Sequence, residues 1–403
     1  MVALKKRNLV ILLAVFLLLG GALAWALGFF MEITSPATDD VTLTAEEYEK
    51  LQALQKYEKL ARIHTHIQEH FYVETDEEAL MEGIYEGAFL GLNDIYSEYL
   101  TPSEMEDLMI ATTGELEGVG VTVTPSEDGN ILVLAPVDGS PAARAGIRPG
   151  DLIVAVDGTE YSGDTINAAV SAMRGPAGTG VELTVLRDGE LLEFSLVRAV
   201  ITQSSVTSEE LEDGISRISI TSFTDSTSED FGEILRDLEL AGTAGLVIDL
   251  RDNPGGVVDG AVEVADLLLE AGVVTYMENQ AGEKTYYHSE AGATDIPFVL
   301  LVNGNTASGS EILAAAVKDN SDAPLVGTVT YGKGIVQEII PLEAGDGIKL
   351  TVLQYFSPLG SSIHQVGIEP DYVVELEEED FDEEGNLIRD RQMEKALELL
   401  RGE

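Results

Sequence analysis

In the second half of the chain, short apolar runs alternate with helical patterns, and this alternation restricts the fold more than any other feature. Residues 246–250 and 298–302 are wholly or almost wholly apolar, which is typical of strands buried on both faces. Helical patterns follow them at 261–269 and at about 310–318, and a further strand begins at 325–327. Strands and helices in alternation predict a largely parallel sheet with helices on its faces.

The first half of the chain has two other patterns. Apolar residues recur every three positions from Tyr48 to Ile63, as in the buried stripe of a helix, and a second helix is expected over 77–92. A third helix opens at Pro102 with Ser103 as its expected N-cap. Residues 118–198 contain short apolar runs separated by Gly, Pro and Asp, which indicates a small β-rich domain with one helix at 165–173.

These changes of pattern divide the chain into five segments and predict a multidomain α+β protein. A last helix is expected at 393–400, after an acidic stretch. The expected segments are an N-terminal anchor or signal sequence (1–33), a helical region (34–110), a β-rich domain (111–200), an α/β core (201–375) and a helical tail (376–403).

The N-terminus carries Lys5, Lys6 and Arg7 before an apolar run at 9–30. A run of this length can span a hydrocarbon layer of roughly 30 Å, and the positive flank stays cytoplasmic. The length favours a single-pass anchor in the cell membrane, with the rest of the chain extracytoplasmic. The alternative is a cleaved signal peptide, because the run contains small-x-small cleavage sites around residues 22–26.

The charge and the absence of cysteine exclude other classes of partner and site. The chain has 23 Lys and Arg against 72 Asp and Glu, a formal net charge of -49. Such a chain repels a phosphate backbone, so nucleic acid is not an expected partner. Without cysteine, neither a disulfide nor a thiolate metal site can form.

Three segments of the β-rich region resemble a PDZ domain. They are Gly-Val-Gly-Val at 118–121, Ser-Pro-Ala-Ala-Arg-Ala-Gly-Ile-Arg-Pro-Gly-Asp at 140–151, and Ile-Val-Ala-Val-Asp-Gly at 153–158. A single glycine of this kind is explained by a turn, but the ordered set indicates the domain. The resemblance implies that a peptide's terminal carboxylate is held by the backbone N–H groups of Val119, Gly120 and Val121.

Arg174 lies in Met-Arg-Gly-Pro at 173–176, within the region that resembles a PDZ domain. Two interpretations stay open for it. Arg174 either relays substrate binding to the active site through a charge pair or is an ordinary surface arginine.

Ser308 and Lys333 are the candidate catalytic residues. Lys333 stands between two glycines among apolar neighbours. Desolvation lowers the pKa of a lysine, and a neutral lysine can take the proton of a serine hydroxyl. Ser308 stands where a strand gives way to a helix, and first-turn N–H groups there can stabilise an oxyanion. The alternative is that Ser308 or Ser310 only caps the helix.

The segments around these residues resemble the active site of the carboxyl-terminal processing peptidases, peptidase family S41. They are Thr-Ala-Ser-Gly-Ser-Glu at 306–311, Tyr-Gly-Lys-Gly-Ile-Val-Gln at 331–337 and Gly-Ile-Glu-Pro-Asp at 367–371. The resemblance extends from about Tyr48 to the end of the chain. It implies a crotonase-like, ClpP-like protease core.

The resemblance also assigns roles to residues at matching positions. The family commonly has alanine in place of Gly309, but a backbone N–H survives that change. The implied roles are Ser308 as nucleophile, Lys333 as general base, Gln337 orienting the lysine amine, the N–H groups of Gly255 and Gly309 as oxyanion hole, and Asp319 as structural support.

The implied function is that of a serine endopeptidase for exported proteins. Its PDZ domain would bind unstructured, apolar C-terminal tails, and the Ser–Lys dyad would cut through an acyl-enzyme. No metal or cofactor is expected, and the family implies a homodimer. The substrate stays open among signalling factors, cell-wall enzymes and misfolded exported proteins.

Other signals favour no different function. Residues 327–334 resemble a P-loop but lack the Ser or Thr after the lysine. His66 and His70 have metal-binding spacing on a helix, but no accompanying carboxylate motif, so packed or solvated histidines are expected. A PDZ adaptor on a degenerate protease scaffold would require Ser308 or Lys333 to be missing or misplaced.

Overall fold

The computed structural model describes residues 2–3, 42–126, 128–202, 204–382 and 384–402. Its contacts divide the chain into two units, 1–88 and 89–403. The apolar run expected to form the anchor lies outside the described residues. Within the described ranges, no helix has both the length and the apolar character that a membrane crossing requires.

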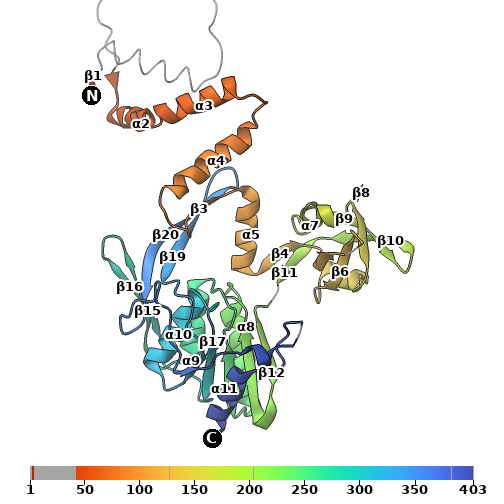
Figure 1. Ribbon diagram of the computed structural model, residues 1–403, viewed down its shortest axis with the longest axis vertical. Coiled ribbons are helices and arrows are strands. Elements are labelled where there is room, and N and C mark those ends of the chain that lie inside the picture. Colours follow the sequence, from red (N-terminus) through yellow and green to blue (C-terminus); the bar gives the residue numbers. More distant parts are fainter. Residues whose placement is uncertain (1, 4–41, 127, 203, 383, 403) are drawn as a thin grey trace, which may run out of the picture. The chain divides into compact units, whose positions relative to one another are not determined.

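The described part of the first unit consists mainly of helices. Its strands β1 (Val2–Ala3) and β2 (Thr42–Leu43) pair in antiparallel fashion. The helices are α2 (Ala45–Gln55), α3 (Glu58–His70) and α4 (Glu77–Leu90), the last of which continues into the second unit (Figure 1).

The expected buried stripe in this unit is wrong. The pattern spans two helices instead of one, and Leu54, Tyr57, Leu60 and Ile63 are all exposed. An α-helix turns by 3.6 residues, so a strict three-residue spacing winds around the helix instead of following one face. The helix expected over 77–92 is present as α4.

Helix α5 (Pro102–Thr113) is capped by Thr101, so the expectation for Ser103 is wrong. The Thr101 hydroxyl accepts a hydrogen bond from the Glu104 N–H at 3.4 Å, and the Glu104 carboxylate accepts one from the Thr101 N–H at 2.9 Å. Because Pro102 occupies the first helical position, the cap must precede it.

The β-rich domain contains a curved sheet with the strand order β10-β9-β7-β6-β5, and β8 pairs with β7. The chain enters and leaves it through an antiparallel ribbon of β4 and β11. The elements are β4 (Glu115–Gly118), β5 (Val121–Pro125), β6 (Ile131–Pro136), α6 (Pro141–Ala145), β7 (Leu152–Val156), β8 (Thr159–Glu160), α7 (Ile166–Met173), β9 (Gly180–Arg187), β10 (Glu190–Val197) and β11 (Ala199–Thr202).

The α/β core contains the expected parallel sheet, with the strand order β12-β13-β14-β17-β18-β21. All neighbouring pairs in it are parallel except β12 with β13. The strands are β12 (Val206–Glu210), β13 (Ile215–Ile220), β14 (Gly245–Asp249), β17 (Phe298–Val302), β18 (Leu325–Gly327) and β21 (Tyr372–Val373).

Helices cover both faces of this sheet because alternate residues of a strand point to opposite sides. Leu246, Ile248 and Leu300 pack in one cluster with side chains of α8 (Thr227–Ala241), α9 (Val258–Leu268) and α10 (Gly309–Asn320). Their neighbours pack in a second cluster with α11 (Arg391–Arg401), namely Val247, Val299 and Leu301. The sheet with helices on its faces confirms the predicted fold class.

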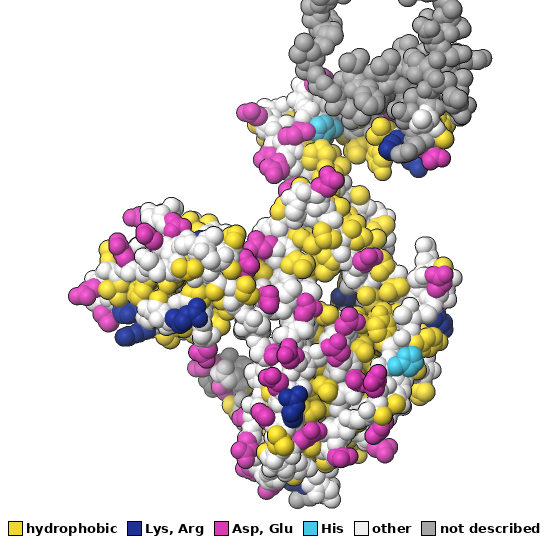
Figure 2. Space-filling view, turned by 180° about the vertical axis from the view of Figure 1, so that it is seen from behind, with side chains coloured by type: hydrophobic (Ala, Val, Ile, Leu, Met, Phe, Trp, Pro, Cys, Tyr) yellow, Lys and Arg dark blue, Asp and Glu magenta, His cyan; other side chains and the backbone are white. Residues whose placement is uncertain are grey.

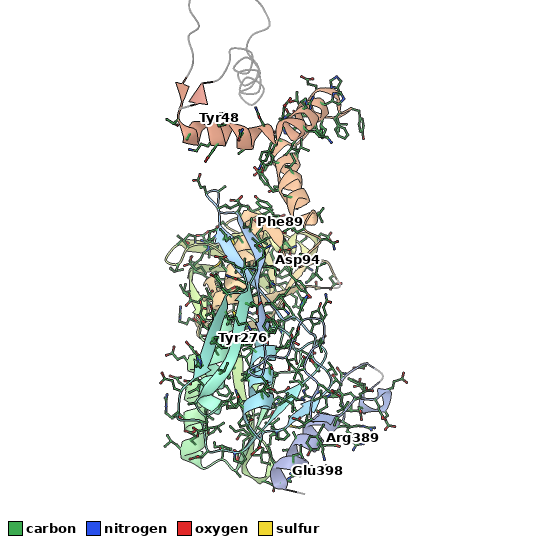
Figure 3. All side chains as sticks on the ribbon, turned by 90° about the vertical axis from the view of Figure 1, so that its left-hand side faces the viewer. Tyr48, Phe89, Asp94, Tyr276, Arg389 and Glu398 are labelled. Atoms are coloured by element: carbon green, nitrogen blue, oxygen red, sulfur yellow. The ribbon has the colours of Figure 1, made fainter. Side chains whose placement is uncertain are left out.

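A second, antiparallel sheet of the core was missed by the sequence analysis. Its order is β16-β15-β20-β19, and β3 also pairs with β20. Tyr276 of β15 (Figure 3) stacks on Phe356 of β20 with 4.9 Å between ring centroids. The strands are β3 (Glu98–Leu100), β15 (Gly272–Asn279), β16 (Lys284–Ser289), β19 (Ile335–Pro341) and β20 (Gly347–Phe356).

Carboxylates are spread over the surface, with few Lys or Arg side chains between them (Figure 2). The basic residues that are present are mostly paired. Arg391 contacts the carboxylates of Glu377, Glu379 and the buried Asp380, which ties α11 to the segment before it. The excess of negative charge therefore faces solvent.

Candidate active site

Ser308 occupies the junction between β17 and α10, as expected. Its backbone has φ 54° and ψ -117°, a conformation that costs energy for a residue with a side chain. The Glu311 N–H donates to the Ser308 carbonyl at 2.8 Å, and Ser308 and Glu311 stand at the N-cap and N3 positions of a capping box. The strained backbone therefore holds Ser308 at the first turn of α10.

The carboxylate of Glu311 joins the segment of Ser308 to the segment of Lys333. Glu311 is fully buried. Its Oε2 accepts from the Ser308 N–H at 2.9 Å and from the Lys333 N–H at 2.8 Å. Its Oε1 accepts from the Thr330 hydroxyl at 2.5 Å and from the Gly332 N–H at 2.7 Å. These four donors replace the water that a buried carboxylate loses.

Tyr355 makes a second link between the same two segments. Its hydroxyl lies 2.9 Å from the carbonyl oxygen of Ser308 and 2.6 Å from that of Lys333. Burial, together with the charge of Glu311, raises the pKa of Tyr355 well above its ordinary value. The hydroxyl therefore stays protonated and able to donate.

Lys333 is half-buried, and burial is the main cause of the lowering of its pKa. The charge of Lys349 lowers the pKa of Lys333 further, whereas the carboxylates of Asp94, Glu311 and Glu98 raise it. The Lys333 Nζ lies 5.2 Å from the centroid of the Tyr96 ring. The lysine is thus partly shielded from water, as a neutral base requires.

Gln337 and Asp319, the two residues predicted to support the site, form hydrogen bonds with residues of nearby elements. The Gln337 amide donates to the Thr351 hydroxyl at 3.3 Å, across the pair of β19 and β20. Asp319, at the end of α10, accepts from the Ser357 hydroxyl at 2.6 Å and from the Leu359 N–H at 3.0 Å. Asp319 therefore holds the loop that follows β20.

Gly255 packs directly against the candidate nucleophile. A Cβ on Gly255 would lie 2.7 Å from the Ser308 Cβ and 2.7 Å from the Gly309 nitrogen, so a side chain does not fit there. The Gly255 N–H donates to the Asn253 Oδ1 at 2.8 Å. Gly309 opens α10, where the first N–H groups have no partner within the helix.

The loop before β5 in the β-rich domain is held from behind through its carbonyl groups. The Val119 carbonyl accepts from the Ala142 N–H at 2.8 Å, and the Gly120 carbonyl accepts from the Ser140 hydroxyl at 2.9 Å. Gly120 has φ 73°, and a Cβ there would lie 2.3 Å from the Ser140 Cβ. Only glycine fits this position, which leads directly into Val121 of β5.

Arg174 connects the β-rich domain to α5. Its guanidinium donates to the Asp107 Oδ1 at 2.6 Å, and both side chains are partly exposed. A salt bridge of this kind contributes at most about 1 kcal/mol.

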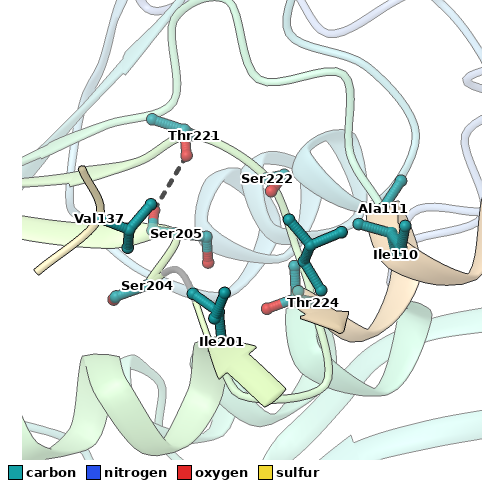
Figure 4. Close-up of a pocket in the computed structure, with 11 residues that line it drawn as sticks. Ile110, Ala111, Val137, Ile201, Ser204, Ser205, Thr221, Ser222 and Thr224 are labelled. Carbon is teal, nitrogen blue, oxygen red and sulfur yellow. Dashed lines mark hydrogen bonds between the residues drawn. The ribbon is translucent and has the colours of Figure 1, made fainter. Parts of the chain in front are cut away.

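A cavity of about 350 Å³ lies where α5, the β4–β11 ribbon and the segment after β13 meet (Figure 4). The Thr221 hydroxyl donates to the Ser205 carbonyl at 3.2 Å in its wall. Phe223, next along this segment from Ser222, donates its N–H to the Gly255 carbonyl at 2.8 Å. The cavity wall therefore continues into the loop that packs against Ser308.

Sequence reasoning identified the segments of the site but missed some of the residues that join them. Ser308 and Glu311 have the spacing of a capping box, which could have identified the carboxylate. No local signal identifies Tyr355, which is 47 residues after Ser308, or Tyr96, which is far from both.

Family models match most of the chain. A model of peptidase family S41 matches residues 214–374, a PDZ domain model matches 132–187, and a model of the activating protease CtpB N-terminal domain matches 17–103.

Curated relatives are similar over most of their length. Carboxy-terminal processing protease CtpA of Bacillus subtilis is 36% identical over 324 residues, covering 80% of this chain and 69% of the relative. The carboxyl-terminal-processing protease of Synechocystis is 38% identical over 320 residues, with 77% and 74% covered. A solved structure, a photosystem II D1 C-terminal processing protease, is 28% identical with a TM-score of 0.48, and the match covers 86% of this chain and 98% of that one.

Proposed function

Because the chain belongs to the carboxy-terminal processing proteases of peptidase family S41 and carries a PDZ domain, we propose that this serine protease cuts with a Ser308–Lys333 dyad. One observation carries the proposal: Glu311 bonds to the backbone N–H groups of both residues. Tyr355 bonds to the carbonyl groups of the same two residues. The two segments are therefore held together from two sides.

In the proposed reaction, the Ser308 hydroxyl attacks the scissile carbonyl while the neutral amine of Lys333 takes its proton. The N–H of Gly309 stabilises the resulting oxyanion. Gly255 adds a second N–H once that group leaves the Asn253 Oδ1, and Gln337 orients the amine. The lysine then protonates the leaving amine and activates the water that releases the acyl group, and no metal or other cofactor takes part.

The substrate enters, in this proposal, by its C-terminal tail. The N–H groups of Val119, Gly120 and Val121 hold the terminal carboxylate, and the tail adds a strand beside β5. In the described part of the domain, β5 stands at one end of the strand order, so its outer edge is open to pairing. Unstructured, apolar tails suit this mode because they pair without first unfolding.

We further propose that the N-terminal run is a single-pass anchor or a cleaved signal sequence, that the protease acts on exported proteins, and that it forms a homodimer. Arg174 would relay occupancy of the PDZ domain through Asp107, because this ion pair joins that domain to α5.

The test measures cleavage of an unfolded protein with an apolar tail by the full chain in detergent. Ser308→Ala and Lys333→Ala are expected to lower turnover by at least about a thousandfold, as loss of a catalytic pair does. Ser310→Ala is the matched control, because this nearby serine donates its hydroxyl to the Asn253 carbonyl at 3.3 Å and has no role in the proposed reaction. Retained turnover in Ser308→Ala would eliminate the dyad. Tail binding without any cleavage by the wild-type chain would indicate an adaptor.

A further inference from the structure

The segment between α4 and β3 brings an aromatic ring to the amine of Lys333. The centroid of the Tyr96 ring lies 5.2 Å from the Lys333 Nζ. Tyr96 is half-buried, although its neighbour Ile95 is 83% exposed. A hydrogen bond with Tyr331 and burial raise the pKa of Tyr96 to about 12, so its hydroxyl stays neutral at working pH.

This ring is held in place by the antiparallel sheet. Asp94 (Figure 3) accepts from the Tyr96 N–H at 3.1 Å and from the Ser97 hydroxyl at 2.6 Å. The Ser97 hydroxyl in turn accepts from the Thr351 N–H of β20 at 2.9 Å. The following residues form β3, which pairs with β20 through Tyr99 and Ile348. The position of the ring is thus set by the backbone of the sheet that borders the candidate base.

We propose that Tyr96 is a positioning residue for the amine of Lys333, covering Nζ with its ring and keeping water from it. The proposal rests on the Ser–Lys dyad proposed above. A ring at this distance also attracts an ammonium ion, which holds the side chain beside it before the proton is lost.

The charges around Lys333 decide the sign of the expected effect. Three carboxylates favour its ammonium form, and burial and Lys349 oppose them. Without the ring, water reaches Nζ and solvates the ammonium at least as well as the ring does, so the pKa of Lys333 rises. The charged groups that act on Lys333 are the carboxylates of Asp94, Glu98 and Glu311 and the amine of Lys349, and the Tyr96 ring lies beside its Nζ. Around them, Tyr331 bonds to Tyr96, Tyr355 bonds to the Lys333 carbonyl, and the backbone of His364 lies against Gly334.

The test measures the rate at which a fluorophosphonate labels Ser308 in the full chain, in detergent, as a function of pH. This reagent needs no PDZ domain to bind, so it reports the activation of the serine. The acid limb of the pH–rate profile is the range in which the labelling rate falls as the pH falls. In Tyr96→Ala, this limb is expected to move to higher pH. Below the limb, labelling slows about tenfold for every pH unit by which the limb moves. At high pH the rate returns to within about twofold of the wild-type rate, because deprotonated lysine is then available in both.

Two variants separate the ring from its surroundings. Tyr96→Phe keeps the ring and is expected to keep the acid limb, and Ile95→Ala tests a change in the same segment away from the lysine. If Tyr96→Ala does not fold, Tyr96→Val replaces it with the same expectations, because valine also leaves most of the ring's space open. The proposal would be overturned if Tyr96→Ala kept the acid limb at its wild-type position. It would also be overturned if the labelling rate fell by the same factor at every pH.

Lys333→Ala distinguishes this failure from a failure of the dyad. If the wild-type chain and Lys333→Ala are labelled equally fast, then Lys333 is not the base and the proposed function fails. If Lys333→Ala is slow while Tyr96→Ala keeps the wild-type limb, only the role of Tyr96 fails.

Discussion

The two sheets of the protease core differ in burial, and the candidate catalytic residues belong to different ones. Every residue of β14 and β17 is buried, and Ser308 follows β17. Most residues of β19 and β20 are only half-buried, and Lys333 precedes β19. The candidate nucleophile therefore follows a fully buried strand, whereas the candidate base lies at the border of a sheet whose strands are only half-buried.

This difference predicts that substitutions in the two halves of the site have different effects. One half is the Ser308 segment beside the parallel sheet, and the other is the Lys333 segment beside the antiparallel sheet. Changes beside the parallel sheet should lower stability and activity together, because they leave buried polar groups unpaired. Changes beside the antiparallel sheet should act mainly on the protonation of Lys333. Glu311 and Tyr355 belong to both halves, since each bonds to the Ser308 and Lys333 segments.

The largest effect is expected for Glu311→Ala, which removes the buried carboxylate that joins the Ser308 and Lys333 segments. Four donors then lose their acceptor in a fully buried place. The free energy of unfolding should fall by at least about 3 kcal/mol, with loss of activity. Urea unfolding of the full chain measures this. Glu311→Gln, which keeps one acceptor oxygen, should lose less, and an Ala variant within about 1 kcal/mol of the wild type would contradict the interpretation.

Tyr355→Phe tests the hydroxyl that links the Ser308 and Lys333 segments, and it should have the second-largest effect. It removes a hydroxyl that lies within hydrogen-bond distance of two carbonyls and leaves the ring in the core. A loss of about 1–3 kcal/mol in stability is expected. The value of kcat should fall more than KM rises, because the bonds position the two candidate catalytic residues and do not contact the PDZ domain. Steady-state kinetics with the tailed substrate would show the opposite split if Tyr355 mainly served binding.

Asp319→Ala tests whether a carboxylate that does not bond to Lys333 affects the protonation of that lysine. The Asp319 carboxylate instead connects α10 to the loop after β20 through Ser357 and Leu359. Two hydrogen bonds are lost at a partly exposed site, so a cost of about 1 kcal/mol is expected. The acid limb of the pH–rate profile should keep its position. A displaced limb would mean that Asp319 acts on the base and is more than a structural support.

The smallest effect is expected for Lys349→Met, which changes only the charge beside the exposed sheet. Lys349 lowers the pKa of Lys333 and also contacts Glu98, which raises it. Removing Lys349 therefore raises the pKa of Lys333. Since the proposed dyad acts through the neutral amine, the acid limb is expected to move to higher pH. Added salt should reduce this displacement. A limb that moves to lower pH would show that the sign is wrong.

The predictability of the fold follows the same division. The strand at 298–302 is predicted with its bounds, because a strand buried on both faces is apolar throughout. The strands β19 and β20 mix polar and apolar residues on half-exposed faces, so their pattern resembles that of loops. The pairing of β3 with β20 joins residues about 250 positions apart, which no local pattern can indicate.

For the candidate site, the sequence by itself determined which residue types stand at the end of a buried strand and in a glycine-flanked turn. These are local properties, because a strand end, a helix start and a tight turn each depend on a few neighbouring residues. Only the tertiary structure decided that Glu311 and Tyr355 join the two segments and that Tyr96 covers the lysine. Such contacts depend on where distant segments pack, and packing is a property of the whole core.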